Sequence, residues 1–187
     1  QAWFRKNVDF SALQCENLKL YLERTRITEL YIDGKKIGRQ ESLCTPHIYD
    51  LNEYIGTGVH EMTICVSNVG YKTKGGHLTS PDTQTNWNGI TGRIELIGYK
   101  NAHAENVMLW CDIHSKTVRV TANITGGKSG KAVISAESFN SEKSHTPEVQ
   151  SFEYTDGKLD ALYKMGNDCL LWSEHEPNLC LLYTSDA

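Results

Sequence analysis

One run of eight residues concentrates the side chains best suited to bind a ligand. Residues 83–90 read Thr-Gln-Thr-Asn-Trp-Asn-Gly-Ile, and a strand-like pattern begins directly after them at Gly92. Amides and hydroxyls hydrogen-bond in fixed directions, and an indole stacks on the apolar face of a ring. Together they favour a polyhydroxylated ligand, for which a sugar is the natural candidate. The residues that we predict to bind it are Gln84, Asn86, Trp87 and Asn88.

Two residues that could contact the ligand, Trp87 and His47, each have a second, structural interpretation. Trp87 could instead plug the end of a β-sandwich, because an indole beside the start of a strand often does so. His47 could contact the ligand, but a histidine directly before the alternating pair Ile48 and Tyr49 is more often a structural hydrogen-bonding residue.

Metal, redox and nucleophilic chemistry have little support. The spacing of His60, His77 and Asp82 matches no metal-ligand template. The six cysteines form no Cys-x-x-Cys pair, and we interpret them as mostly buried free thiols, with a disulfide as the alternative. The Gly-x-Ser-x-Gly motif of a serine nucleophile is missing. We therefore predict neither a metal nor a cofactor.

The elements that must position the loop are strands. Apolar residues alternate with polar ones along residues 18–23, 62–67 and 117–124, which is the period of an antiparallel strand with one buried face. Asp33-Gly34 and Asp156-Gly157 supply the positive φ that tight hairpin turns need. No segment sustains a helical period beyond about one turn. The sequence therefore predicts an all-β chain and excludes a complete barrel of alternating strands and helices.

The alternation breaks at residues 99–105 and restarts with Val107, which predicts two β-sandwich domains, 1–100 and 101–187. Trp110 and Trp172 fall in strand patterns, so we expect both in the core. The strands expected in the second domain lie near residues 107–113, 116–125, 131–139, 149–155, 158–164 and 169–172.

Composition limits the partners. The chain has 187 residues, a formal net charge of −4 and a pI near 6.0, and its basic residues are scattered, which disfavours nucleic acid. No apolar run approaches the roughly 18 to 20 residues that cross a membrane. The chain begins without methionine in a strand-like pattern, so we expect a fragment.

Several sequence blocks resemble one known family. In the order in which they occur, they are AWFRK (2–6), LYLERT (20–25), YIDGKKIG (31–38), TPHIYDL (45–51) and GVHEMTI (58–64), followed by TQTNWNGI (83–90). This series resembles the N-terminal sugar-binding domain of glycoside hydrolase family 2, which includes β-galactosidases, β-glucuronidases and β-mannosidases. Residues 171–179 are similar to the Leu-Trp-x-x-x-x-Pro-x-Leu-Tyr signature of the family's next domain, with Cys180 in place of the tyrosine.

The resemblance implies a jelly roll followed by an immunoglobulin-like sandwich, the second one truncated. In the family, a closing strand and a catalytic β/α barrel follow, and we expect neither here. Residues 180–187 lose the family pattern, and we expect them to be a translated cloning or sequencing junction. Retaining glycosidases need two carboxyl groups about 5 to 5.5 Å apart, which the family places on the barrel. Glu174 and Glu176 are a close pair beside His175, but we expect an exposed polar edge there.

The resemblance also implies a function. We expect the non-catalytic, sugar-binding N-terminal portion of a retaining β-glycosidase, inactive alone, whose loop at 86–88 helps to form the sugar site of a missing C-terminal barrel. The partners are then a β-glycoside and that barrel. The alternative is a free-standing carbohydrate-binding or adhesion module. Because the resemblance is mainly to bacterial sequences, a periplasmic or secreted location is favoured.

Overall fold

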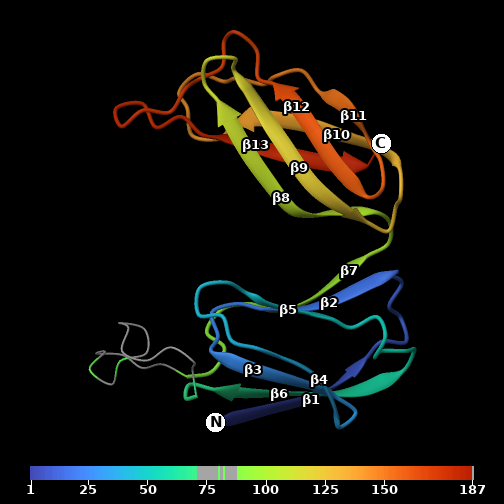
Figure 1. Ribbon diagram of the computed structural model, residues 1–187. Helices are drawn as coiled ribbons and strands as arrows, with labels where there is room; N and C mark the ends of the chain where they lie inside the picture. The colour runs from blue at the N-terminus through green and yellow to red at the C-terminus, as the bar shows by residue number, and fades with distance from the viewer. Residues whose placement is uncertain (71–79, 81, 83–87, 187) are drawn as a thin grey trace. The chain divides into compact units, whose positions relative to one another are not determined.

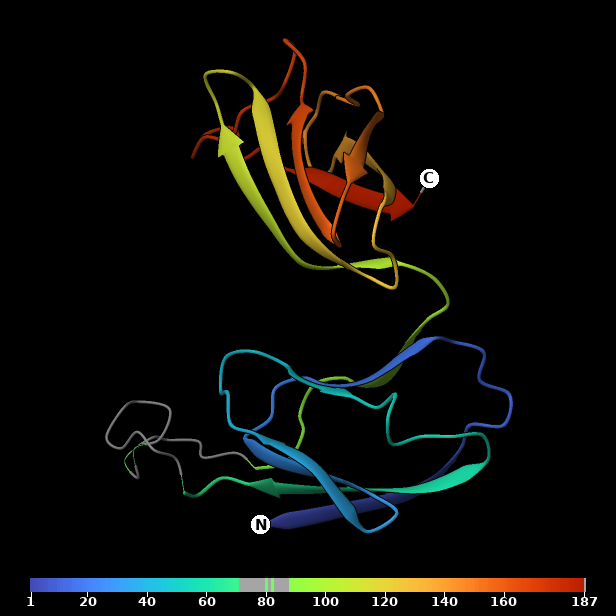
Figure 2. The same ribbon diagram turned by 45° about the vertical axis from the view of Figure 1, so that its right-hand side comes forward.

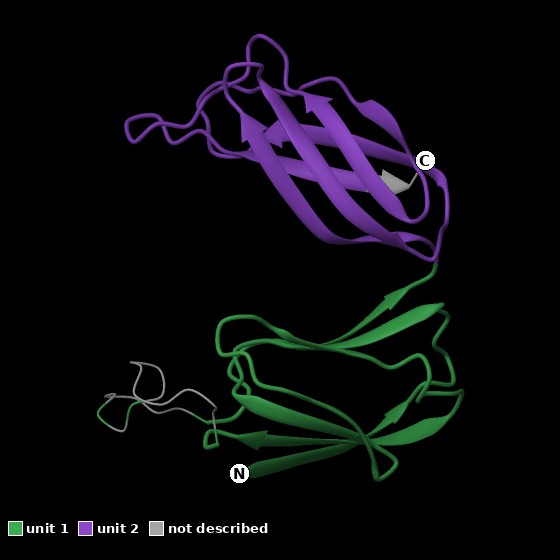
Figure 3. Ribbon diagram, in the orientation of Figure 1, with its two compact units in different colours: residues 1–100 green, residues 101–187 purple. Residues whose placement is uncertain are grey.

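The computed structural model describes residues 1–70, 80, 82 and 88–186, with the side chains of Ser185 and Asp186 left out of the description. Its described part is all-β, as the sequence predicts, and every strand pairing is antiparallel (Figure 1). The described residues hold no helix long and apolar enough to cross a membrane. The chain divides into two compact units, residues 1–100 and 101–187 (Figure 3).

The first unit is a sandwich of two sheets. One sheet has the order β1-β6-β3-β4, and the other has the order β5-β2-β7. These strands are β1 (Ala2–Asp9), β2 (Asn17–Leu22), β3 (Ile27–Ile32), β4 (Lys35–Gln40), β5 (His47–Asp50), β6 (Val59–Ser67) and β7 (Ile94–Tyr99).

The core of the first unit follows from the period-two alternation. Alternate residues of β2, β3 and β6 turn inward, and the most deeply buried of them are Leu22, Leu30 and Val66. The hairpin between β3 and β4 turns at Asp33 and Gly34, which both have positive φ. This is the backbone conformation that the Asp-Gly pair predicts.

The second unit is a sandwich of two three-stranded sheets, with the orders β12-β9-β8 and β11-β10-β13. Its strands are β8 (His103–Asp112), β9 (Thr117–Thr125), β10 (Gly130–Ser138), β11 (Gln150–Tyr154), β12 (Lys158–Lys164) and β13 (Cys180–Asp186). The core forms around Val120, Ile134 and Tyr163, which are almost completely shielded from solvent.

The expectation that Trp110 and Trp172 lie in the core is wrong. Their exposed fractions are 55% and 64%. In the pairing of β8 with β9, Leu109 lies opposite the buried Val120, whereas Trp110 lies opposite the exposed Arg119. Because side chains alternate across a sheet, Trp110 must then face outward. Trp172 lies in a loop with one isolated bridge to Pro177, and the strand predicted at 169–172 does not form.

The segment after Leu179 also differs from its prediction. Residues 180–186 form β13, which pairs with β10 along its length, so the expectation that no strand follows Leu179 is wrong. Strand pairing uses backbone N–H and C=O groups, which every sequence supplies apart from proline. A strand can therefore form on the open edge of β10 even where the side chains depart from the family pattern. The cloning or sequencing junction stays a prediction.

The six cysteines are all free thiols. Cys65 is buried, and burial raises the pKa of its thiol. Cys15, Cys169 and Cys180 are half-buried, and Cys44 and Cys111 are exposed, so the prediction of mostly buried thiols holds for Cys65 alone.

Candidate functional site

The candidate residues belong to the connection between β6 and β7, two strands of the first unit (Figure 2). Of the residues predicted to bind a ligand, Gln84, Asn86 and Trp87 lie outside the described part of the chain, and Asn88 lies inside it. The two interpretations of Trp87 therefore both stay predictions. What the structure describes is how the two ends of the loop are held.

The end that enters β7 is bonded to the corner between β2 and β3. The Thr91 N–H donates to the Arg24 carbonyl oxygen at 3.1 Å, and the Gly92 N–H donates to the Glu23 carbonyl oxygen at 3.1 Å. A glycine is required at 92, because an added Cβ would lie 2.8 Å from the Glu23 carbonyl oxygen. These backbone bonds fix where the chain leaves the loop.

Asn88 lies on the surface at this fixed end. Its side-chain oxygen accepts a hydrogen bond from the Gly89 N–H at 2.9 Å, which orients the amide. Gly89 has a φ of 99°, a conformation that favours glycine, and its carbonyl oxygen accepts from the buried Thr25 hydroxyl at 3.3 Å. Ile90 turns inward and packs on the core. Asn88 is thus an exposed amide on an anchored turn.

A charged pair reinforces the anchor. Arg93 donates from both its backbone N–H and its Nε to the Glu23 carboxylate, at 3.2 and 3.1 Å. These two bonds lower the pKa of Glu23. The Arg93 guanidinium also lies 5.1 Å from the centre of the Tyr21 ring, a cation–π contact. Because Arg93 is exposed, these contacts orient the start of β7 but add little to the free energy of unfolding.

The end that leaves β6 meets the same corner. Ser67 pairs with Ile27 in the β3–β6 ladder and is buried. Its hydroxyl lies 3.2 Å from the Val69 carbonyl oxygen and 3.4 Å from the Val69 N–H. The connection from β6 to β7 therefore starts and ends at the same corner, and the anchor next to residues 83–90 is the end that enters β7.

His47 belongs to the interior instead. Its side chain is fully shielded, with Nδ1 2.5 Å from the Thr28 hydroxyl and Nε2 2.9 Å from the Ser42 carbonyl oxygen. Burial lowers the pKa of His47. This geometry favours the structural interpretation of the residue.

The other candidates have ordinary surroundings. The described residues contain no cluster of three or more His, Cys, Asp or Glu suited to a metal. His60 pairs with Asp33 at 2.6 Å, and His77 lies outside the described residues. Glu174 and Glu176 are both exposed, in the loop that carries the Trp172–Pro177 bridge.

One surface was missed by the sequence reasoning. Trp3 and Arg5 alternate on β1, and Tyr31 occupies the outward face of β3, yet the sequence indicates these residues only as members of the family blocks. The signal that could have found them is an aromatic residue on the polar face of an alternating strand. Trp3 is 58% exposed, although it lies in a strand of a well-packed sandwich.

Comparison with known proteins identifies the fold. No protein-family profile matches the chain. A β-galactosidase of Clostridium acetobutylicum is 21% identical over 154 residues, which are 82% of this chain and 17% of that protein.

Solved structures of the same fold cover nearly the whole chain. A β-glucuronidase of Bacteroides uniformis superposes with a TM-score of 0.75 at 14% identity, over 97% of this chain and 24% of its own. A β-mannosidase of Dictyoglomus thermophilum gives 0.67 at 16% identity, over 98% and 27%. A glycosyl hydrolase family 2 member of Bacteroides cellulosilyticus gives 0.70 at 14% identity, over 97% and 26%.

This chain thus spans about a sixth of its β-galactosidase relative and about a quarter of these three solved chains. It has the fold of the N-terminal β-sandwich domains of glycoside hydrolase family 2, and the resemblance predicted from its sequence blocks is confirmed.

Proposed function

We propose that the chain is the non-catalytic, sugar-binding portion of a family 2 β-glycosidase, and that its β6–β7 loop contributes to the carbohydrate site of the complete enzyme. Residues 1–100 are then the sugar-binding jelly roll and residues 101–187 the immunoglobulin-like domain. The complete enzyme hydrolyses O-glycosidic bonds, and its acid and nucleophile lie on a barrel outside this chain.

The observation that carries the proposal is the anchored base of the loop. A loop that recognises hydroxyl groups must hold its donors and acceptors in place, because an amide that must be ordered on binding loses affinity. The connection that carries this loop starts and ends at the corner at residues 23–28, and Asn88 is exposed there with its amide oriented. The similarity to β-galactosidase and β-glucuronidase chains supports a sugar as the ligand.

The first test is genetic. Reading the encoding DNA downstream should show an open frame that continues into a β/α barrel with two glutamates in catalytic positions. A natural stop codon directly after this chain, with a signal peptide upstream, would instead support the free-standing carbohydrate-binding module.

The second test uses the complete enzyme. Asn86→Ala and Asn88→Ala should each lower kcat/KM on an aryl β-glycoside by roughly 5- to 150-fold, the effect of leaving a buried partner unpaired at about 1 to 3 kcal/mol. Asn123→Ala is the matched control, because Asn123 is an exposed asparagine on β9 in the other unit. Full activity in both loop variants, together with a lowered melting temperature for Trp87→Ala, would show that the loop is a structural plug.

A further inference from the structure

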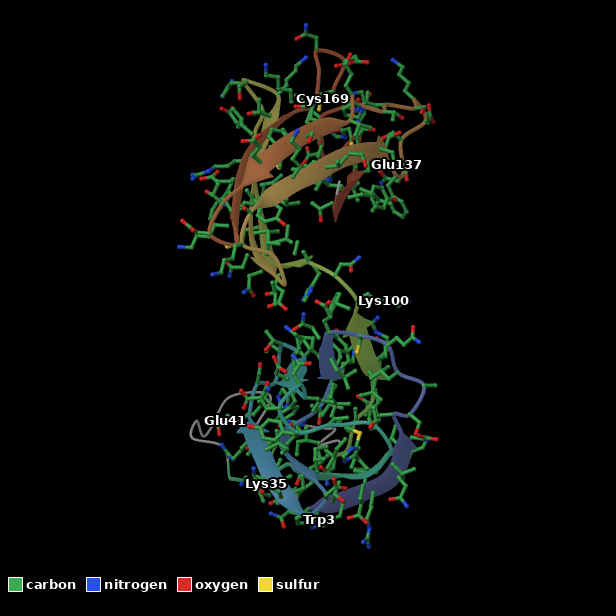
Figure 4. The ribbon with its side chains drawn as sticks, turned by 90° about the vertical axis from the view of Figure 1, so that its right-hand side faces the viewer. Trp3, Lys35, Glu41, Lys100, Glu137 and Cys169 are labelled. Atoms are coloured by element: carbon green, nitrogen blue, oxygen red, sulfur yellow. The ribbon has the colours of Figure 1, made fainter. Side chains whose placement is uncertain are left out.

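The outward face of the sheet β1-β6-β3 carries a second set of ligand-type side chains. We define this Trp3 face by Trp3 and Arg5 on β1, Glu61 and Thr63 on β6, and Tyr31 on β3. Arg5 and Tyr31 are both paired with Thr63, so the three form one row across three strands. Trp3 lies one position along the same face, at the outside of the unit (Figure 4). The face includes no residue of the β6–β7 loop.

Two aromatic rings form the apolar part of the Trp3 face. The ring centres of Trp3 and Tyr31 lie 5.7 Å apart, with their planes tilted by 42°. Tyr31 is held in place because its hydroxyl donates to Glu29 at 2.9 Å, and Glu29 also accepts from Lys36 at 2.6 Å. Trp3 is 58% exposed beside this fixed ring, so its indole offers an accessible flat surface on which a ligand can stack.

Polar groups surround the rings. The exposed Arg5 and the half-buried Glu61 lie 3.4 Å apart, and Thr63 occupies β6 between Arg5 on β1 and Tyr31 on β3. These residues line a hollow of about 440 Å³ with Trp3 and Gly34. A hollow of this size lies within the range of small-molecule sites. An aromatic platform with a guanidinium, a carboxylate and a hydroxyl at its rim offers stacking together with both donors and acceptors.

We propose that the Trp3 face binds a neutral pyranose, with an apolar sugar face stacked on Trp3 and hydroxyls bonded to Arg5 and Glu61. Glu61 neutralises Arg5, so the pair offers no net positive charge to attract the carboxylate of a uronic acid, whereas both groups can bond to neutral hydroxyls. Four of the six lining residues carry polar side chains, which fits a hydroxyl-rich ligand better than the apolar centre of a protein interface. The proposal does not depend on the β6–β7 loop.

The test is a titration of this 187-residue chain, labelled with ¹⁵N, using methyl β-D-galactopyranoside, methyl β-D-mannopyranoside and methyl β-D-glucuronide. The indole N–H signal of Trp3, assigned by its loss in Trp3→Phe, should move in a saturable way with at least one neutral glycoside. The glucuronide should bind more weakly. Trp110 is an internal control, because it is 55% exposed and lies opposite Arg119, which pairs with Asp160, but it does not line the hollow at Trp3.

Variants separate this site from the loop. Trp3→Ala removes the indole signal, so binding to this variant is followed on the backbone N–H signals of Thr63 and Tyr31, where no saturable shift should remain. Arg5→Gln should weaken binding at least about fivefold. Trp110→Ala should leave it unchanged, and a dispersed spectrum will show that each variant is folded.

The proposal is overturned by no saturable shift with either neutral glycoside, by an equal shift at Trp110, or by preferential binding of the glucuronide. Binding that moves only Trp87 would overturn it as well, while supporting the loop. Loss of the Trp3 signal change would leave the effect of Asn86→Ala and Asn88→Ala on catalysis untouched, so the two proposals fail independently.

Discussion

The Thr28 hydroxyl and the Nδ1 atom of His47 lie 2.5 Å apart in the interior of the first unit. The Ser42 carbonyl oxygen can only accept, so Nε2 of His47 carries a proton, and Nδ1 of the neutral ring accepts from Thr28. The Tyr49 hydroxyl also contacts Thr28. It lies 2.7 Å from the Thr28 side-chain oxygen and 3.0 Å from the Thr28 carbonyl oxygen. The neutral form of His47 is therefore fully hydrogen-bonded.

This arrangement predicts a pH dependence of stability. Burial lowers the pKa of His47 below its ordinary value of 6.5, so below that pH the unfolded chain binds a proton that the folded chain does not. The free energy of unfolding should thus be greatest above pH 6.5. It should decline as the pH falls from 6.5 to the pKa of the folded state. Urea titrations at several pH values measure this slope.

His47→Gln tests the assignment. The variant should be less stable at neutral pH, because the buried bond to Thr28 is disturbed, but its stability should fall less between pH 7 and 5. His175→Gln is the control, since it makes the same substitution at a histidine whose side chain is 87% exposed. An unchanged slope in His47→Gln would assign the pH dependence to other groups.

Gly92 predicts a steric effect at the base of the candidate loop. An added Cβ would lie 2.8 Å from the Cβ, Cγ and carbonyl oxygen of Glu23, and the backbone atom among these cannot turn aside. Gly92→Ala should therefore lower the free energy of unfolding by about 1 to 3 kcal/mol. Gly56→Ala is the matched control, because its Cβ would meet no atom within 4 Å. Equal melting temperatures for the two variants would contradict the close contact between residues 92 and 23.

Most strands of both units could be predicted because alternation depends only on local sequence, but β13 was not expected and the strand predicted at 169–172 does not form. Which face is covered depends on what packs against it. Along β8, Val107, Leu109 and Cys111 alternate as a buried strand would, yet all three are exposed. β8 is the edge of a three-stranded sheet, and Leu109, Ile113 and Leu182 line a hollow of about 310 Å³ between the two sheets. A single sequence does not show where the facing sheet ends.

The loop shows a different limit. Its composition predicted a ligand site, but its anchors depend on residues far away in the chain. The bond from Thr25 to Gly89 spans 64 positions, and the bond from Arg93 to Glu23 spans 70. No local pattern joins such positions. The Trp3 face was missed for the same reason, since Trp3 and Tyr31 come together only when β1 and β3 both pair with β6.

A substitution at Trp110 distinguishes the core position expected from the sequence from the surface position found in the structure. A buried tryptophan costs about 3 to 5 kcal/mol when truncated to alanine. At 55% exposure opposite Arg119, Trp110→Thr should instead change the free energy of unfolding of this chain by less than about 0.5 kcal/mol. Chemical denaturation of the two proteins side by side measures the difference. A decrease of several kcal/mol in the free energy of unfolding would show that Trp110 is buried in the core.

Two neighbouring leucines test the placement of β13. Leu182 lies opposite the buried Ala136 and packs on the core of the second unit, whereas Leu181 lies opposite Glu137 and is 41% exposed. Leu182→Ser should lower the free energy of unfolding by about 1 to 3 kcal/mol, because it replaces packed methyl groups with an unpaired hydroxyl. Leu181→Ser should change it by less than about 0.5 kcal/mol.

The comparison is sharp because both variants make the same chemical change one residue apart, on opposite faces of one strand. If β13 pairs with β10 in the register found here, only the inward substitution can reach the core. Thermal unfolding followed in the near-ultraviolet, where packed aromatic residues such as Tyr163 report, would distinguish them. Equal and small effects of both substitutions would mean that residues 180–186 do not dock on β10, and that the edge of β10 is open, as the sequence alone predicted.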